Sequence, residues 1–252
     1  MPETIVLLHG FSGTSRAWDG VAARLDPERY RPLALDLPGH GDRAGAKGMG
    51  GTMSFAACAE LVLAQAPEHF TLCGYSLGGR VALHLALAAP ERVRRVALVS
   101  TSPGIEDPAE RAARREADEL LAQRLEAEPF ERFIAAWRSQ PLFADDPPYV
   151  AAHASALMRR NEPRSLAAAM RGLGAGAMEP LWGRLGELAM PVELLAGRRD
   201  ADYVAIARRA LEAIPDGRLT VLEGGHALPL ENPDGVARVL QQPGRLDPEP
   251  GA

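Results

Sequence analysis

The chain has 252 residues, 46% of them hydrophobic and 24% charged, with a formal net charge of −5. These values are typical of a soluble globular protein and exclude a disordered, collagen-like or coiled-coil chain. The acidic balance argues against a nucleic-acid surface. No run of the sequence approaches the roughly 18 apolar residues that span a membrane.

Short apolar runs alternate with helical patterns along the first hundred residues. Strands are predicted at 4–8, 31–35, 70–73 and 93–99, helices at 18–25, 54–65 and 77–88, and a glycine-rich loop at 45–52. From 107 to about 185 the patterns are helical and broken by prolines. Strands return at 192–196 and 218–222, each followed by a helix, at 203–213 and 233–240. Alternation of this kind predicts a mostly parallel, doubly wound α/β sheet. We expect a core at 1–102 and 186–241, a helical lid at 103–185 and a flexible tail at 242–252.

The compartment and the need for cofactors are indicated by a few residue types. Two cysteines, Cys58 and Cys73, are too few for a disulfide framework or a four-thiolate zinc site. No basic segment precedes the first apolar run, so no signal peptide is expected. We therefore expect a cytoplasmic protein. No pair of histidines has metal-ligand spacing with a carboxylate, so we expect no metal. We also expect no cofactor, because the serine, histidine and aspartate described below suffice for proton transfer. The oligomeric state stays open.

The segment Gly74-Tyr75-Ser76-Leu77-Gly78 fits the pattern G-x-S-x-G. In a nucleophile elbow the serine occupies a strained turn from strand to helix, and small residues flank it where backbones crowd. The segment lies directly after the strand at 70–73 and before an Ala- and Leu-rich helix, which is the context that the pattern requires. We predict that Ser76 is the catalytic serine.

A serine at an elbow requires a base and an acid that orients the base. In this arrangement they follow in the order Ser, Asp or Glu, His, each on a loop after a late strand. His226 follows the strand at 218–222 and Asp200 follows the strand at 192–196, so both are predicted members of a triad. The nearest alternative acid is Asp202. His40 is expected to hold a loop.

The loop His9-Gly10-Phe11-Ser12-Gly13 follows the first strand. Such a loop supplies one N–H of an oxyanion hole, and the residue after the nucleophile supplies the second. The backbone N–H groups of Phe11 and Leu77 are therefore the candidate donors.

With these motifs the chain resembles the α/β-hydrolase superfamily over essentially its whole length. HGFSG at 9–13, DLPGHG at 36–41 and GYSLGGRVAL at 74–83 also resemble the 2-succinyl-6-hydroxy-2,4-cyclohexadiene-1-carboxylate (SHCHC) synthases of menaquinone biosynthesis. So do lid segments such as W..QPLFA at 137–144 and R-N-x-P-x-SLA at 160–167. These segments are specific because lids differ most among hydrolases.

The resemblance implies a lyase rather than a hydrolase. The family eliminates pyruvate from 2-succinyl-5-enolpyruvyl-6-hydroxy-3-cyclohexene-1-carboxylate, so the expected partner is a small anionic carboxylate. The resemblance further implies substrate contacts by Arg80, Arg114, Arg159 or Arg160, Trp137 and Tyr75. It implies that Ser76 acts as a base, with its own proton drawn by His226. The chain's one lysine is Lys47, so the loop after Asp200 lacks the basic residue found in some members.

Two other functions stay open at this point. A carboxylesterase or a carbon–carbon bond hydrolase could use the same triad, with Ser76 attacking a carbonyl or assisting water. A lipophilic ester pocket would not favour the arginines of the lid. A non-catalytic binding protein of the same fold is the other alternative, and the complete triad argues against it.

Overall fold

The computed structural model describes residues 2–43 and 53–242. Six strands form one sheet in the order β2-β1-β3-β4-β5-β6, and all five neighbouring pairs are parallel. The strands are β1 (Glu3–Leu8), β2 (Tyr30–Leu35), β3 (Phe70–Tyr75), β4 (Val93–Val99), β5 (Val192–Gly197) and β6 (Gly217–Leu222). Each of the six predicted strands is present, with ends within two residues of those expected. The expected mostly parallel, doubly wound sheet is therefore confirmed.

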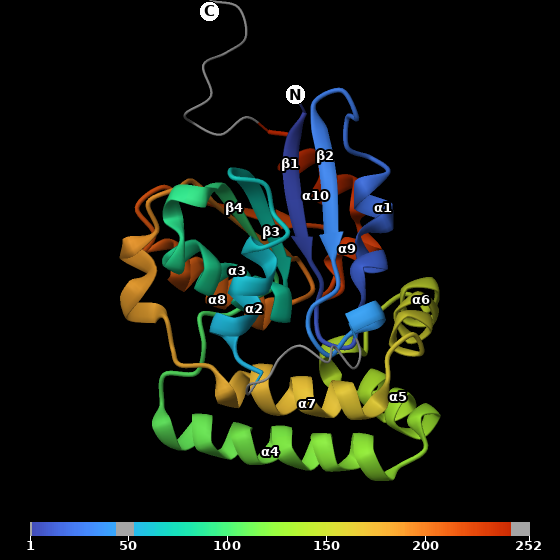
Figure 1. Ribbon diagram of the computed structural model, residues 1–252. Coiled ribbons are helices and arrows are strands. Elements are labelled where there is room, and N and C mark those ends of the chain that lie inside the picture. The colour runs from blue at the N-terminus through green and yellow to red at the C-terminus, as the bar shows by residue number, and fades with distance from the viewer. Residues whose placement is uncertain (1, 44–52, 243–252) are drawn as a thin grey trace, which may run out of the picture.

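Helices cover both faces of the sheet. On one face lie α2 (Phe55–Leu63), α3 (Leu77–Ala88) and α8 (Ala201–Leu211); on the other lie α1 (Asp19–Ala22) and α10 (Pro233–Leu240), next to the short α9 (Leu228–Glu231) (Figure 1). In β1, Ile5 and Leu7 pack on the face of α1 and α10, whereas Val6 and Leu8 pack on the opposite face. Burial of both faces explains why the strands read as continuous apolar runs.

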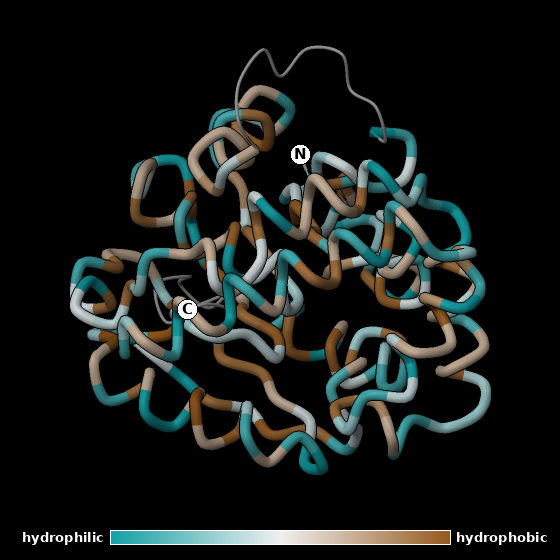
Figure 2. Tube along the Cα trace, turned by 90° about the horizontal axis from the view of Figure 1, so that it is seen from below, coloured by the Kyte–Doolittle hydropathy of each residue, from teal (hydrophilic) through white to brown (hydrophobic). Residues whose placement is uncertain are grey.

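Between β4 and β5 the chain forms a layer of helices. They are α4 (Pro108–Ala127), α5 (Phe130–Arg138), α6 (Pro148–Met158) and α7 (Pro163–Leu173). Figure 1 shows α4 and α7 side by side beyond the carboxyl ends of the strands. Seen from below, hydrophobic and hydrophilic residues alternate along the helical turns (Figure 2). The apolar sides of the lid helices meet in a small core of their own, which includes Phe133, Leu166 and Met170.

Sequence signals set the ends of the lid helices. The Asp107 side chain accepts hydrogen bonds from the N–H groups of Ala109 and Glu110, and Glu162 caps α7 in the same way. Proline stands at the first helical position of both helices, where its missing N–H costs no hydrogen bond. These caps are local, which is why the lid is recognisable as helical from the sequence.

Some predicted elements differ from the structure. The helix expected at 18–25 is a 3-10 turn, Ser15–Trp18, followed by the single turn α1. Further 3-10 helices are Gly41–Arg43, Pro90–Arg92, Pro141–Phe143, Ala175–Ala177 and Trp182–Glu187. The last of these crosses the expected lid boundary at 185. The loop at 45–52 and all but the first residue of the tail at 242–252 lie outside the described residues. Within the described ranges, no helix combines the length and apolar composition needed to cross a bilayer.

Candidate active site

Ser76 occupies a sharp turn between β3 and α3. Its backbone angles are φ 51° and ψ −111°, a conformation that L-residues rarely adopt. The flanking glycines are required sterically: a Cβ at Gly74 would overlap the carbonyl of Gly78, and a Cβ at Gly78 would overlap the carbonyl of Leu8. The Thr101 hydroxyl donates a 2.7 Å hydrogen bond to the Ser76 carbonyl from the end of β4. The elbow is therefore crowded by β1 and hydrogen-bonded to residues at and just after the end of β4.

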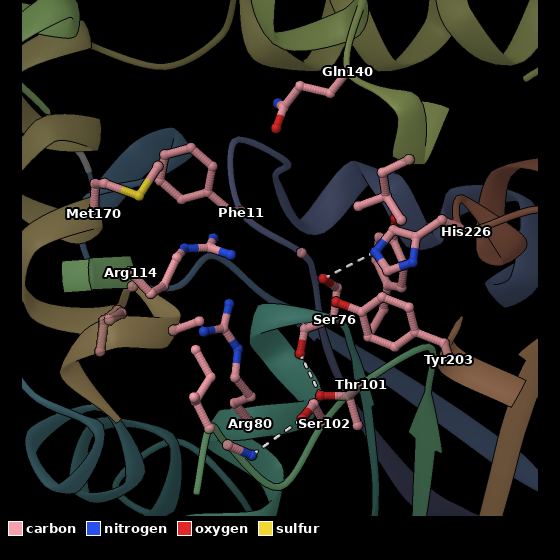
Figure 3. A pocket seen from close by; sticks show the side chains of 18 of the residues that line it. Phe11, Ser76, Arg80, Thr101, Ser102, Arg114, Gln140, Met170, Tyr203 and His226 are labelled. Carbon is pink, nitrogen blue, oxygen red and sulfur yellow. Dashed lines mark hydrogen bonds between the residues drawn. The ribbon is translucent and has the colours of Figure 1, made fainter. Parts of the chain in front are cut away.

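The three predicted triad residues meet at the carboxyl edge of the sheet. His226 Nε2 lies 3.2 Å from Ser76 Oγ (Figure 3). His226 Nδ1 lies 2.8 Å from Asp200 Oδ2. His226 and Asp200 are buried. With the Nδ1 proton donated to Asp200, Nε2 is free to accept the serine proton. This is the geometry of a general base held by a carboxylate.

The candidate oxyanion donors lie beside the serine. Leu77 is the first residue of α3, where N–H groups have no intrahelical partner. Phe11 lines the cavity from the loop after β1. No hydrogen bond of the described loops uses the N–H of either residue. Both N–H groups are thus available to a ligand.

Two buried histidines support the loop that carries Phe11. His9 Nε2 accepts a hydrogen bond from the N–H of Leu37, and the His9 and His40 rings lie 5.0 Å apart. His40 Nδ1 bonds to the carbonyl of Pro38. Burial and the neighbouring His9 lower the pKa of His40 to about 3. His40 therefore holds a loop, as the sequence predicts, and does so in its neutral form.

A cavity of about 170 Å³ separates the triad from the lid. Its walls combine the elbow, the loops after β1 and β4, and residues of α4, α7 and α8. Tyr75 and Trp137, both predicted to face the substrate, line it. The ring centroids of Trp137 and Phe11 lie 5.1 Å apart, so the lid contacts the loop after β1 through an aromatic pair. The cavity can enclose a small molecule against Ser76.

Arg80 and Arg114 both direct their guanidinium groups into this cavity (Figure 3). Arg80 comes from α3, one turn after Ser76, and its buried Nη1 has no hydrogen-bond partner within the described residues. Burial lowers the pKa of Arg80, and the positive charge of Arg114 acts in the same direction. A guanidinium nevertheless stays charged in proteins. Two cations facing one cavity favour an anionic ligand.

Arg114 is oriented by a residue that the sequence analysis missed. Its Nε donates a 2.7 Å hydrogen bond to Oδ1 of Asp118, and Oδ2 of Asp118 accepts the N–H of Gly176 at 3.0 Å. Asp118 is one turn further along α4 and is buried. An acidic residue four positions after an arginine is a common pattern on helix surfaces, so the sequence alone does not single out Asp118. Its burial in the structure does.

Arg159 and Arg160 do not line the cavity, which corrects the expectation drawn from the resemblance. The Arg159 guanidinium makes two 2.8 Å hydrogen bonds to the exposed carboxylate of Glu131, and Arg160 is exposed. The reason is the direction of the turn after α6: the next residue, Asn161, points inward instead. Its amide donates to the carbonyl of Ser12 and its oxygen accepts the N–H of Gly41, which ties the lid to two core loops.

Within the described residues, no group of three or more His, Cys, Asp or Glu side chains is arranged to hold a metal ion. His69 and His153 are exposed, and His84 stacks on Phe55 with ring centroids 4.5 Å apart. The polar side chains that line the cavity include Ser76, His226, Arg80 and Arg114.

The fold, the elbow and the order of the triad define an α/β hydrolase, and the model of the Alpha/beta hydrolase family matches residues 5–239. Comparison with curated proteins narrows the family further. The chain is 34% identical to 2-succinyl-6-hydroxy-2,4-cyclohexadiene-1-carboxylate synthase of Enterobacter sp. (strain 638), over 96% of this chain and 92% of that protein. A putative synthase of the same name from Bacillus subtilis is 30% identical, over 95% and 89%. The chain belongs to this family of SHCHC synthases.

Solved structures agree with that assignment. MenH from S. aureus superposes with a TM-score of 0.88 at 31% identity, covering 94% of this chain and 91% of its own. The enol-lactonase from Burkholderia xenovorans LB400 superposes with a TM-score of 0.77 at 21% identity, over 95% and 90%. At that identity the second likeness shows the fold alone.

Proposed function

We propose that this protein eliminates pyruvate from 2-succinyl-5-enolpyruvyl-6-hydroxy-3-cyclohexene-1-carboxylate to give SHCHC, a step of menaquinone biosynthesis. The observation that carries the proposal is the pair Arg80 and Arg114, which face Ser76 across one cavity. The substrate is a polyanion, and a guanidinium can bind a carboxylate through two parallel N–H bonds. The names of the related synthases support the same reaction.

In the proposed mechanism His226, oriented by Asp200, accepts the proton of Ser76. The serine oxygen then removes the ring proton next to the activating group of the substrate. The electron pair of that C–H bond shifts through the ring, and the C–O bond to the enolpyruvyl group breaks. The ring proton restores the Ser76 hydroxyl, and the departing enolate of pyruvate takes the proton held by His226, which restores the neutral histidine. No water is consumed and no covalent enzyme intermediate forms.

Negative charge builds up on the substrate during this step. We infer that the N–H groups of Phe11 and Leu77 stabilise it, because donors fixed in advance need no reorganisation as charge develops. We infer that no cofactor is required, since proton transfer and charge stabilisation suffice. We also infer that the protein acts in the cytoplasm, where the buried thiols of Cys58 and Cys73 stay reduced.

A carboxylesterase or carbon–carbon bond hydrolase is the competing function. The same serine would then attack a carbonyl carbon. The arginines disfavour it, because a neutral ester gains little from a cavity in which Arg80 presents an unpaired donor.

The deciding experiment follows pyruvate release and the ultraviolet absorbance of the conjugated diene, with the enolpyruvyl substrate made in situ. We expect turnover far above background, and a loss of about 10²- to 10⁴-fold in Ser76→Ala. Ser139→Ala, in an exposed turn outside the cavity, is the matched control. Hydrolysis of short p-nitrophenyl esters without lyase turnover would favour the competing function.

A further inference from the structure

Tyr203 lines the cavity and has no part in the proposed mechanism. It lies on α8, three residues after Asp200, and its ring centroid is 4.5 Å from that of His226. Figure 3 shows its hydroxyl directed into the cavity, on the side of Ser76. The ring therefore packs on the catalytic histidine while the polar end faces the space that a ligand would fill.

Among the hydrogen bonds of residues 2–43 and 53–242, none involves the Tyr203 hydroxyl. The buried Nη1 of Arg80 lacks a partner as well. Arg80 and Tyr203 are close enough for each to affect the ionisation of the other. Two polar groups from different helices, α3 and α8, thus face one part of the cavity without partners. A buried donor such as Nη1 of Arg80 is costly to leave unsatisfied, so the pair marks the place where a ligand supplies the acceptor.

The Tyr203 hydroxyl is a donor at neutral pH. Burial raises the pKa of its phenol above the usual value, and the positive charges of Arg80 and Arg114 offset only part of that rise. A protonated phenol has one O–H to give, and the guanidinium of Arg80 has only donors. Neither can satisfy the other fully, but a carboxylate offers two oxygens and accepts from both.

We propose that Tyr203 binds the substrate directly: its hydroxyl donates a hydrogen bond to the same carboxylate that Arg80 binds. This inference rests on the proposed function for the identity of the carboxylate. Arg80 approaches from the helix that carries Ser76, and Tyr203 approaches from the helix after Asp200. Donors from two directions fix the rotation of the carboxylate as well as its position, which sets the distance from the reacting C–H bond to Ser76.

The test compares Tyr203→Phe with the wild-type protein. The phenylalanine keeps the ring against His226 and removes only the hydroxyl. Tyr149→Phe is the matched control, because Tyr149 is exposed and its hydroxyl donates to the carbonyl of Glu231 outside the cavity. We expect KM to rise about 10- to 100-fold in Tyr203→Phe with little change in kcat, as for a lost hydrogen bond to a charged group.

A double variant sharpens the test. If Arg80 and Tyr203 bind one carboxylate, the fold-loss of kcat/KM in the double variant is smaller than the product of the fold-losses in Arg80→Met and Tyr203→Phe. Fully independent effects would contradict a shared carboxylate. A fall in kcat with an unchanged KM and a shifted pH–rate profile would overturn the proposal too, since it would assign the hydroxyl to the Ser76–His226 pair.

Calorimetric binding of SHCHC itself separates this inference from the proposed function. Weaker binding to Tyr203→Phe than to wild type supports the inference even if the wild type shows no lyase turnover, which would defeat only the proposed function. Equal affinities and equal KM values in an active enzyme defeat only the inference. Absence of both turnover and binding in the wild type defeats both.

Discussion

Arg114 and Asp118 form a pair one turn apart on α4 in which the carboxylate is buried and the guanidinium faces the cavity. The 2.7 Å bond uses only Nε, so the two Nη atoms of Arg114 are left for a ligand. A surface pair of this spacing contributes little to stability. Here the second oxygen of Asp118 also holds Gly176, so the aspartate links the orientation of Arg114 to the fold of the lid.

Asp118→Asn tests that link. The amide keeps the volume but loses the charge that fixes Arg114, so we expect KM to rise about tenfold while kcat changes little. Glu116→Gln, an exposed residue of the same helix, is expected to leave both constants unchanged. Steady-state kinetics of the two variants give the comparison. An unchanged KM in Asp118→Asn would show that Arg114 needs no such support.

Arg80→Met is expected to raise the stability of the protein and to lower its activity. Removing a buried guanidinium with an unpartnered Nη1 relieves a desolvation cost, so the midpoint of thermal unfolding should rise. The same change removes a carboxylate contact, so kcat/KM should fall at least about tenfold. Calorimetry and kinetics on one preparation measure both. Arg208→Met, at an exposed site on α8, is the control for the loss of one positive charge.

Gly78→Ala is expected to be severely destabilising, by about 3 kcal/mol or more, because its Cβ would overlap the backbone carbonyl of Leu8. Gly183→Ala is the contrasting variant, since no atom lies within 4 Å of the added Cβ. Urea denaturation of both variants measures the difference. Similar free energies of unfolding for the two would mean that the elbow can relax without loss.

The stability of the fold should fall below neutral pH. Burial lowers the pKa of His40 to about 3, and burial lowers that of His9 as well, whereas both have ordinary values near 6.5 when unfolded. The unfolded chain therefore binds more protons below pH 6.5. As the pH falls from 6.5 to 3, His40 lowers the free energy of unfolding by at most about 1.4 kcal/mol per pH unit. Above pH 6.5 no loss from His40 is expected.

Free energies of unfolding at pH 7 and pH 5 measure this slope. In His40→Gln the difference between the two pH values should shrink, although the variant is less stable at pH 7. His153→Gln, at an exposed position, should keep the wild-type difference. A wild-type slope that His40→Gln leaves intact would assign the acid sensitivity to other groups.

The amino-acid sequence by itself determined the sheet, the elbow and the pairing of the triad. Apolar runs of five or six residues mark the strands because both faces of a parallel sheet are buried. The elbow lies within five consecutive residues, so local sterics define it. Asp200 and His226 are predictable because the carboxyl ends of parallel strands meet at one edge. For Arg80 the helical spacing alone indicates no role, and the expected substrate contact came from the resemblance of GYSLGGRVAL to the SHCHC synthases.

The tertiary structure alone decided which side chains of the lid and of α8 reach the cavity. The rotation of α6 and the turn after it place Asn161 inward and leave Arg159 and Arg160 in solvent, although the local sequence permits either. Asp118 reaches Arg114, and Tyr203 reaches the cavity, in the same way, from helices that pack across the edge of the sheet. Such packing depends on contacts between residues far apart in the chain, and a rotation of one helix by a single residue, about 100°, exchanges its buried and exposed sides.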